Sequence, residues 1–185
     1  MKKKFILQFV FASIVLSSCT QKDTYQSVTN GVQVQFDSVF VKAQFYTNSI
    51  VRVQKWAVGS TDSKTSLMVV IDSLQTLDIS VSQSNGHIVL KSPELVVKIS
   101  EKDGAISYFD AQNQQIVAEK GHAVFTPYLS PNEKAWSIAQ TFALTKNEAI
   151  YGLGQHQYGY MNYRGKEVKL VQTNTDAVIP FLWST

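Results

Sequence analysis

Alternation of apolar and polar residues constrains the fold of this chain more than any other feature. Three early segments show it, at Val32–Phe36, Val41–Phe45 and Ile50–Gln54. A period of two puts every second side chain on the same face of a strand, so each segment can place one face on a core. No segment sustains the 3.6-residue period of an amphipathic helix. The sequence therefore predicts an all-β fold, specifically an antiparallel β-sandwich.

Turn dipeptides separate the apolar segments. Asn30-Gly31, Asn85-Gly86 and Asp103-Gly104 supply the positive φ angles that tight hairpins need. Asp103-Gly104 lies between Val96–Ser100 and Ile106–Phe109, which predicts a hairpin there. The remaining expected strands are Leu67–Ile71, Leu77–Gln83, Ile88–Lys91, Leu95–Ile99, Ala105–Phe109, Gln115–Ala118, Ala135–Ala143, Ile150–Leu153, Glu167–Val171 and Ala177–Trp183.

Composition is that of a folded, nearly neutral domain. The chain has 185 residues, of which 44% are hydrophobic and 17% charged, so it can bury a core as one domain, with at most a fragment of a second. Its net charge of +3 comes from Lys2, Lys3 and Lys4, because the other 14 basic residues balance the 14 acidic ones. A neutral chain with scattered charges gives no electrostatic reason to bind nucleic acid.

The N-terminus has the pattern of an export signal. Lys2–Lys4 precede the apolar run Phe5–Leu16, which is shorter than the roughly 20 residues that span a bilayer. Leu16-Ser-Ser-Cys19 then has the form of a bacterial lipobox around the only cysteine. We predict a lipoprotein signal peptide at 1–18, lipidation of Cys19 and a polar tether at 19–30, before a sandwich domain at 31–185. An ordinary secretory signal with a free thiol, or a signal anchor, is the alternative.

Thr20-Gln-Lys-Asp-Thr24 resembles the surface-export signal of Bacteroidetes lipoproteins, although a polar tether has the same composition. The expected location is therefore the outer membrane, through a lipid anchor, on its periplasmic face or at the cell surface.

The C-terminal segment combines glycines, amides and aromatic residues around His156. His156 is open to two interpretations, a satisfied surface histidine or a donor to a ligand hydroxyl. The aromatic residues either pack in the sandwich or offer faces to a sugar. Gly152-Leu-Gly154 lacks the third glycine of a dinucleotide-binding loop, and the three histidines have no further ligands at metal-binding spacing. The sequence thus predicts neither a cofactor nor a metal.

Several motifs resemble one family. They are Glu148-x-x-Tyr-Gly-Leu-Gly-Gln-His-Gln157, Asn162-Tyr-Arg-Gly165 and Asn174-Thr-Asp-x-x-Ile-Pro-Phe-x-x-Ser184, with earlier agreement at Ile50-Val-Arg-Val53, Ser66-Leu-Met-Val69 and Asp103-Gly-Ala-Ile-Ser-Tyr-Phe-Asp110. Together they resemble the N-terminal β-sandwich of glycoside hydrolase family 31, in its bacterial α-xylosidase branch. The resemblance covers roughly residues 31–185.

The resemblance implies a galactose-mutarotase-like sandwich that packs on a (β/α)₈ barrel, where two aspartates perform retaining hydrolysis. The expectation is a chain truncated before that barrel, with no catalytic residue and no activity of its own. In relatives, one sandwich loop reaches the active-site mouth. This implies substrate binding by Asp176, then Asn174, with His156 a third candidate, while an Asx-turn without any ligand is the alternative.

The functional hypothesis is therefore a carbohydrate-binding or supporting domain of an exo-acting retaining α-glycosidase of α-xylosidase type. The parent enzyme would hydrolyse terminal α-linkages in oligosaccharides such as those from xyloglucan. The first alternative is a stand-alone surface lipoprotein that binds carbohydrate, and the second is a structural cell-surface module without a ligand.

Overall fold

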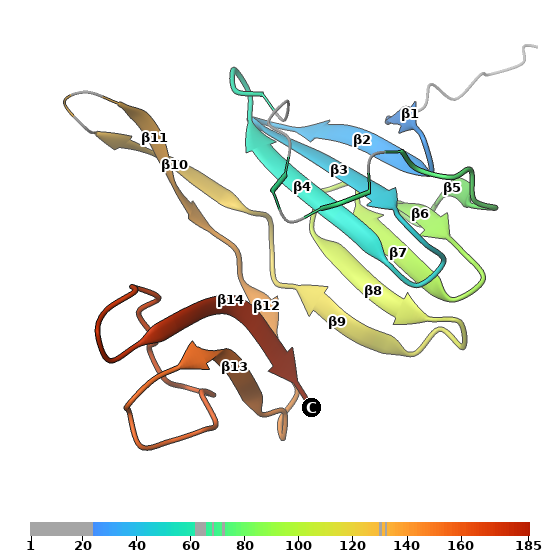
Figure 1. Ribbon diagram of the computed structural model, residues 1–185. Helices are drawn as coiled ribbons and strands as arrows, with labels where there is room; N and C mark the ends of the chain where they lie inside the picture. The colour runs from blue at the N-terminus through green and yellow to red at the C-terminus, as the bar shows by residue number, and fades with distance from the viewer. Residues whose placement is uncertain (1–23, 62–65, 68, 72, 130, 132) are drawn as a thin grey trace, which may run out of the picture.

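Two antiparallel sheets form the body of the protein in the computed structural model, which describes residues 24–61, 66–67, 69–71, 73–129, 131 and 133–185 (Figure 1). The first sheet has the order β1 (Gln26–Val28), β2 (Gly31–Phe36), β3 (Val39–Phe45) and β4 (Val51–Ala57). The second has the order β12-β9-β8-β7-β6-β5. Its strands are β5 (Ser80–Ser84), β6 (His87–Lys91), β7 (Leu95–Ser100), β8 (Ile106–Asp110), β9 (Gln115–Glu119) and β12 (Phe142–Ala143).

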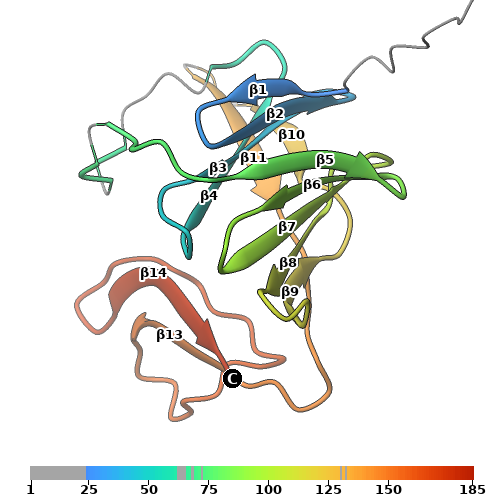
Figure 2. The same ribbon diagram turned by 90° about the vertical axis from the view of Figure 1, so that its right-hand side faces the viewer.

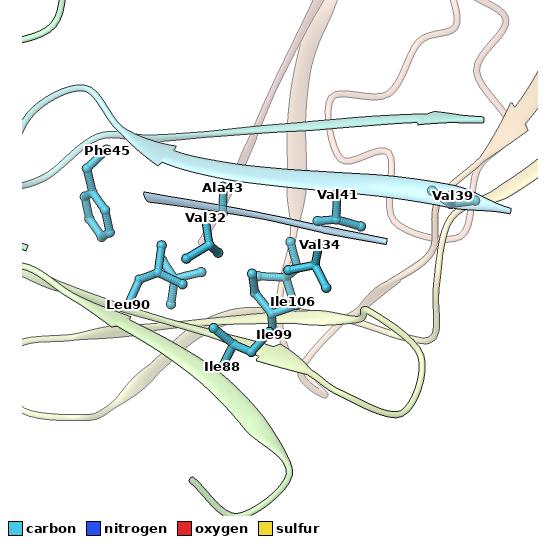
Figure 3. Close-up of a cluster of buried hydrophobic side chains, with 11 residues drawn as sticks. Val32, Val34, Val39, Val41, Ala43, Phe45, Ile88, Leu90, Ile99 and Ile106 are labelled. Atoms are coloured by element: carbon cyan, nitrogen blue, oxygen red, sulfur yellow. The ribbon is translucent and has the colours of Figure 1, made fainter. Parts of the chain in front are cut away.

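The core lies between these sheets. Along β3, buried and half-buried residues alternate strictly, and β6 and β7 also bury apolar side chains. Figure 3 shows valine side chains of β2 and β3 pointing toward isoleucines of β6, β7 and β8. Phe45, Ile88, Leu90, Ile99 and Ile106 are completely buried. Burial of each such side chain stabilises the folded state by about 1.5–3 kcal/mol relative to leaving it in water, and this burial is the main source of stability for the fold.

Two further hairpins leave the sandwich. One consists of β10 (Val124–Leu129) and β11 (Lys134–Ala139), and the other of β13 (Ile150–Gln155) and β14 (Ala177–Ser184). Figure 1 and Figure 2 both place the β13–β14 hairpin on the β9 side of the sandwich, away from β1 and β2. A long connection from residue 156 to 176 joins β13 to β14.

The structure confirms the all-β antiparallel sandwich and the Asp103-Gly104 hairpin, in which Ile99 pairs with Ile106. The prediction of a tether through residue 30 is wrong for Gln26–Val28, which is strand β1. Asn30, at φ 54°, makes the turn into β2. Strand pairing uses backbone groups, so a polar segment can join the sheet without an apolar face.

Other strand predictions also needed correction. Residues 167–171 and the described part of 67–71 form no strand, because alternation alone supplies no neighbouring strand for their backbone groups. Ala135–Ala143 divides into β11 and β12. The expected strands do not include β10, which contains Pro127, a residue without an amide hydrogen to donate. In a two-stranded hairpin, one side of the strand has no partner, so this proline is tolerated.

The leader and lipobox predictions, including Cys19, lie outside the described residues. Within the described part of the chain, no helix is long and apolar enough to cross a membrane.

Candidate functional site

A glycine bulge shapes the β13–β14 hairpin. The register shifts between Gly152 and Gly154, and Leu153 between them has φ 64°. The two glycines have φ 97° and 98°. A Cβ on Gly152 would lie 2.6 Å from the Phe181 carbonyl oxygen, and one on Gly154 would lie 2.0 Å from that of Ala177. Both positions therefore require glycine, because the two strands approach too closely for any side chain.

The residues just before β14 form a tight polar turn, the 172–176 turn. The Thr173 hydroxyl oxygen accepts the amide hydrogens of Thr175 at 3.3 Å and Asp176 at 3.2 Å, and the same hydroxyl lies 3.4 Å from Asp176 Oδ2. The Gln172 side-chain oxygen accepts the Val178 amide hydrogen at 3.0 Å. Asn174 is exposed at the tip. The turn is thus built on Thr173 and not on an Asx side chain, and Thr173 is a site residue that the sequence analysis missed.

His156 lies beneath this turn with its side chain fully buried. Its ring stacks on Tyr158, with centroids 5.2 Å apart and planes at 5°, and meets Tyr163 edge-on at 6.1 Å. Nε2 lies 2.9 Å from the Leu153 carbonyl oxygen, and Nδ1 lies 3.7 Å from Asp176 Oδ1. The surface interpretation of His156 is therefore wrong. Binding of a ligand by His156 stays a prediction.

A row of tyrosines extends from this contact. Tyr158 and Tyr160 stack at 5.7 Å, and Tyr160 meets Tyr163 edge-on at 5.6 Å. Tyr163 is buried, whereas Tyr158 is 40% exposed. Partial desolvation and, secondarily, the Asp176 carboxylate raise the pKa of the Tyr158 phenol. The structure thus brings Asp176 and His156 together and adds an exposed aromatic ring beside them, with Asn174 two residues away.

Other motif residues hold this loop to the hairpin. The Arg164 guanidinium donates to the Glu148 carbonyl oxygen at 2.6 Å. The Asn162 side-chain oxygen accepts the amide hydrogens of Ile150 at 3.1 Å and Arg164 at 3.0 Å. The amide of Thr145 donates to the Glu148 carboxylate at 2.7 Å, and this bond lowers the pKa of Glu148. These residues fix the geometry of the loop.

Two aspartates outside this loop have structural partners. Asp103 Oδ1 accepts the Ala105 amide hydrogen, and Asp110 Oδ1 accepts those of Gln112 and Gln114. Both aspartates therefore close hairpin turns. Among the described residues, no group of three or more His, Cys, Asp or Glu side chains could hold a metal ion.

Comparison with known protein families identifies the family to which this domain belongs. Residues 41–184 match the glycosyl hydrolase 31 N-terminal galactose mutarotase-like domain. The match covers most of the chain, so the chain belongs to that domain family. The residues that carried the sequence resemblance, from Ile50 to Ser184, fall within the matched range.

Individual relatives agree with the family. Over 156 residues the chain is 31% identical to an α-xylosidase from Saccharolobus solfataricus, and the match covers 78% of this chain and 21% of that protein. The crystal structure of a family 31 α-xylosidase from Xanthomonas citri has a TM-score of 0.78 at 31% identity, covering 86% of this chain and 18% of that one. A family 31 α-xylosidase from a soil metagenome, solved with xylose, has a TM-score of 0.72 at 15% identity, covering 88% and 26%. The chain thus spans about a fifth of the length of its matched curated relatives.

Proposed function

We propose that this chain is the N-terminal domain of a retaining exo-α-glycosidase of α-xylosidase type, and that its 172–176 turn forms one side of the substrate site. One observation carries the proposal. The Asp176 carboxylate, whose side chain is 19% exposed, lies directly before β14 of the glycine-bulged hairpin and near the exposed Tyr158 ring, in a chain similar to α-xylosidases. The carboxylate suits the hydroxyls of a pyranose, and the exposed part of the Tyr158 ring, which stacks on His156 and Tyr160, offers an apolar contact beside it.

Each residue has a distinct part in this proposal. Asp176 accepts hydrogen bonds from sugar hydroxyls, and the Asn174 amide can both donate and accept. Retaining hydrolysis also needs two carboxyl groups about 5–5.5 Å apart, one as nucleophile and one as acid/base. We place that pair in a further (β/α)₈ barrel domain, which is the intramolecular partner of this sandwich. A terminal α-xylosyl unit, as in xyloglucan-derived oligosaccharides, is the proposed substrate.

Anchoring is a separate part of the proposal. We infer lipidation of Cys19 and attachment to the outer membrane, supported by the lipobox at Leu16–Cys19 and the preceding apolar run. Mass spectrometry of the mature N-terminal peptide should find an acylated cysteine. Replacement of Cys19 by Ala should release the protein from membranes, and an unmodified cysteine in the wild type would disprove the anchor.

The catalytic proposal is tested by comparing two proteins. One is the 185-residue chain, and the other is the product of the complete reading frame that contains codon 185. Nitrophenyl α-xyloside should be hydrolysed only by the second protein, because the chain alone supplies binding groups without a nucleophile and acid. Turnover by the pure 185-residue chain would overturn the assignment. Tight oligosaccharide binding by that chain, with no catalytic domain in the reading frame, would favour the stand-alone binding module.

A further inference from the structure

Nδ1 of His156 and Oδ1 of Asp176 lie 3.7 Å apart, slightly beyond hydrogen-bonding distance. The Leu153 carbonyl oxygen can only accept a hydrogen bond, so Nε2 must carry the ring hydrogen in the neutral histidine. The lone pair on Nδ1 then faces an Asp176 oxygen 3.7 Å away. Nδ1 is buried and has no hydrogen-bond partner among the described residues. Two acceptors therefore face each other, and the histidine nitrogen is buried while the Asp176 side chain is 19% exposed.

Protonation of Nδ1 would convert this contact into a charge-assisted hydrogen bond. Imidazolium donates from both nitrogens, so Nε2 keeps its bond to Leu153 while Nδ1 donates to the carboxylate. A short approach of the turn, of less than an ångström, brings the two atoms within bonding distance. The 172–176 turn can make that approach because it is exposed, whereas the histidine ring is held by its contacts with Tyr158 and Tyr163.

Among the described residues, the acidic group that contacts the His156 ring is the Asp176 carboxylate. Tyr158 and Tyr163 contact the ring as neutral phenols, and Tyr160 packs against both of them. The positive charge of Lys166 lies over Tyr160, 5.1 Å from the ring centre. The carboxylate is thus the charged group next to Nδ1.

We propose that His156 is a positioning residue for Asp176: its protonated ring donates from Nδ1 to the carboxylate and holds the 172–176 turn in one position. The proton comes from solvent as the pH falls, so the turn is held at lower pH and released at higher pH. The effect of this contact on sugar binding rests on the function proposed above. The coupling between protonation of His156 and the position of the turn is independent of that function.

The experiment uses the 185-residue chain without any sugar. Imidazole NMR reports the His156 tautomer between about pH 5 and 8, the range in which histidine changes charge. Hydrogen exchange of the Thr175 and Asp176 amides, both bonded to Thr173, reports the turn. We expect an Nε2-protonated ring at high pH. As the ring becomes doubly protonated, amide protection should rise roughly tenfold beyond the intrinsic change, the effect of one charge-assisted bond.

Three variants separate coupling from mere packing. Asp176→Asn keeps the size of the side chain and removes its charge, so most of the rise in protection should vanish. His156→Gln should abolish the pH dependence. His87→Gln is the matched control, because Nδ1 of His87 lies 2.9 Å from the Asn85 carbonyl oxygen in the exposed β5–β6 turn, and this variant should behave as wild type. A His156 ring that stays neutral throughout, or protection that rises equally in Asp176→Asn, would overturn the proposal.

A second readout connects the contact to substrate binding. In the product of the complete reading frame, KM for an α-xyloside should rise with pH as His156 loses its proton, while kcat follows a different profile. His156→Gln should remove that dependence of KM. Coupled protonation and protection in a protein that hydrolyses no α-glycoside would refute the proposed function and leave this inference standing. Hydrolysis of an α-xyloside by a protein in which protonation of His156 leaves the amide protection of the 172–176 turn unchanged would support the proposed function and refute this inference.

Discussion

The sandwich and the β13–β14 hairpin are built by different forces. In the sandwich, side chains from both sheets are completely buried and form a continuous apolar core. In the hairpin, Ile179, Phe181, Leu182 and Trp183 are all more than half exposed. There, two glycines, the Thr173 turn and the contacts of Arg164 and Asn162 keep the chain in place. The sandwich is therefore stabilised mainly by burial of apolar side chains, whereas the candidate site is held by backbone geometry and hydrogen bonds.

One pair of leucines tests this contrast most strongly. Leu90 is fully buried in β6, whereas Leu182 in β14 is 57% exposed. Leu90→Ala should lower the free energy of unfolding by about 3 kcal/mol, because it leaves a cavity in the core. Leu182→Ala should change it by about 0.5 kcal/mol or less. Urea unfolding followed by circular dichroism measures both, and equal effects would contradict the contrast.

A charged pair inside the sandwich should have an effect nearly as large. The Lys55 ammonium lies 2.6 Å from Glu119, and their side chains are 10% and 4% exposed. Glu119 also accepts the Ile106 amide hydrogen at 2.9 Å, which ties β4 of one sheet to β8 and β9 of the other. Glu119→Gln leaves a buried ammonium without its countercharge and should cost about 3 kcal/mol.

The control for this variant is Glu94→Gln, at an exposed position in the β6–β7 turn, which should cost about 0.5 kcal/mol or less. A Glu119 variant as stable as this control would show that the buried pair is dispensable. Chemical denaturation of both variants supplies the measurement.

In the hairpin, a glycine substitution should act locally. Gly154→Ala places a Cβ 2.0 Å from a backbone oxygen, so β13 and β14 must separate. Gly159→Ala, at φ 76° with open space around it, should cost only about 1 kcal/mol of backbone strain. Limited proteolysis should cut within residues 150–184 only in the Gly154 variant. Loss of the cooperative unfolding of the sandwich in that variant would contradict the independence of the two regions.

The smallest expected effect is the contribution of Asp103 to the pH dependence of stability. A hydrogen bond from Ser100, helped by the Ala105 amide, lowers the pKa of Asp103 below its ordinary value of 3.8. Such a carboxylate stabilises the fold above its ordinary pKa, and the stabilisation is lost as pH falls through the lower, folded value. Asp103→Asn should therefore be less stable than wild type at neutral pH, and the difference should fade below about pH 4. A difference that instead grows in acid would refute this assignment. Thermal unfolding at several pH values measures it.

Glu148, just before β13, resembles Asp103 in this respect. The hydrogen bond from the Thr145 amide lowers the pKa of the Glu148 carboxyl. Glu148→Gln should loosen the start of β13 with the same pH dependence and leave the sandwich unchanged. Amide exchange of Thr145 is the direct measurement, and a pH-independent loss of protection would show that charge has no part.

Local sequence patterns are sufficient to predict the sandwich. Val32–Phe36 and Val41–Phe45 carry their alternation within a few residues, and a period of two is local information about which face is buried. The family match confirms the resemblance, while substrate binding by the segment that contains Asp176 stays a prediction. Sequence could not locate β1 or β10, because strand pairing satisfies backbone groups whatever the side chains are, as Gln26 and Pro127 show.

The assembly of the candidate site, in contrast, depends on the folded arrangement of the whole segment. His156 and Asp176 are twenty residues apart in sequence, and their meeting depends on the bulge at Gly152–Gly154 and on the Thr173 turn. No local pattern encodes that distance, since it results from backbone dihedrals summed along the whole connection. The same folding placed the His156 side chain in the interior and left Tyr158 exposed. Residue types in the sequence thus indicate which side chains are candidates, and the fold determines which of them contact each other and which remain exposed.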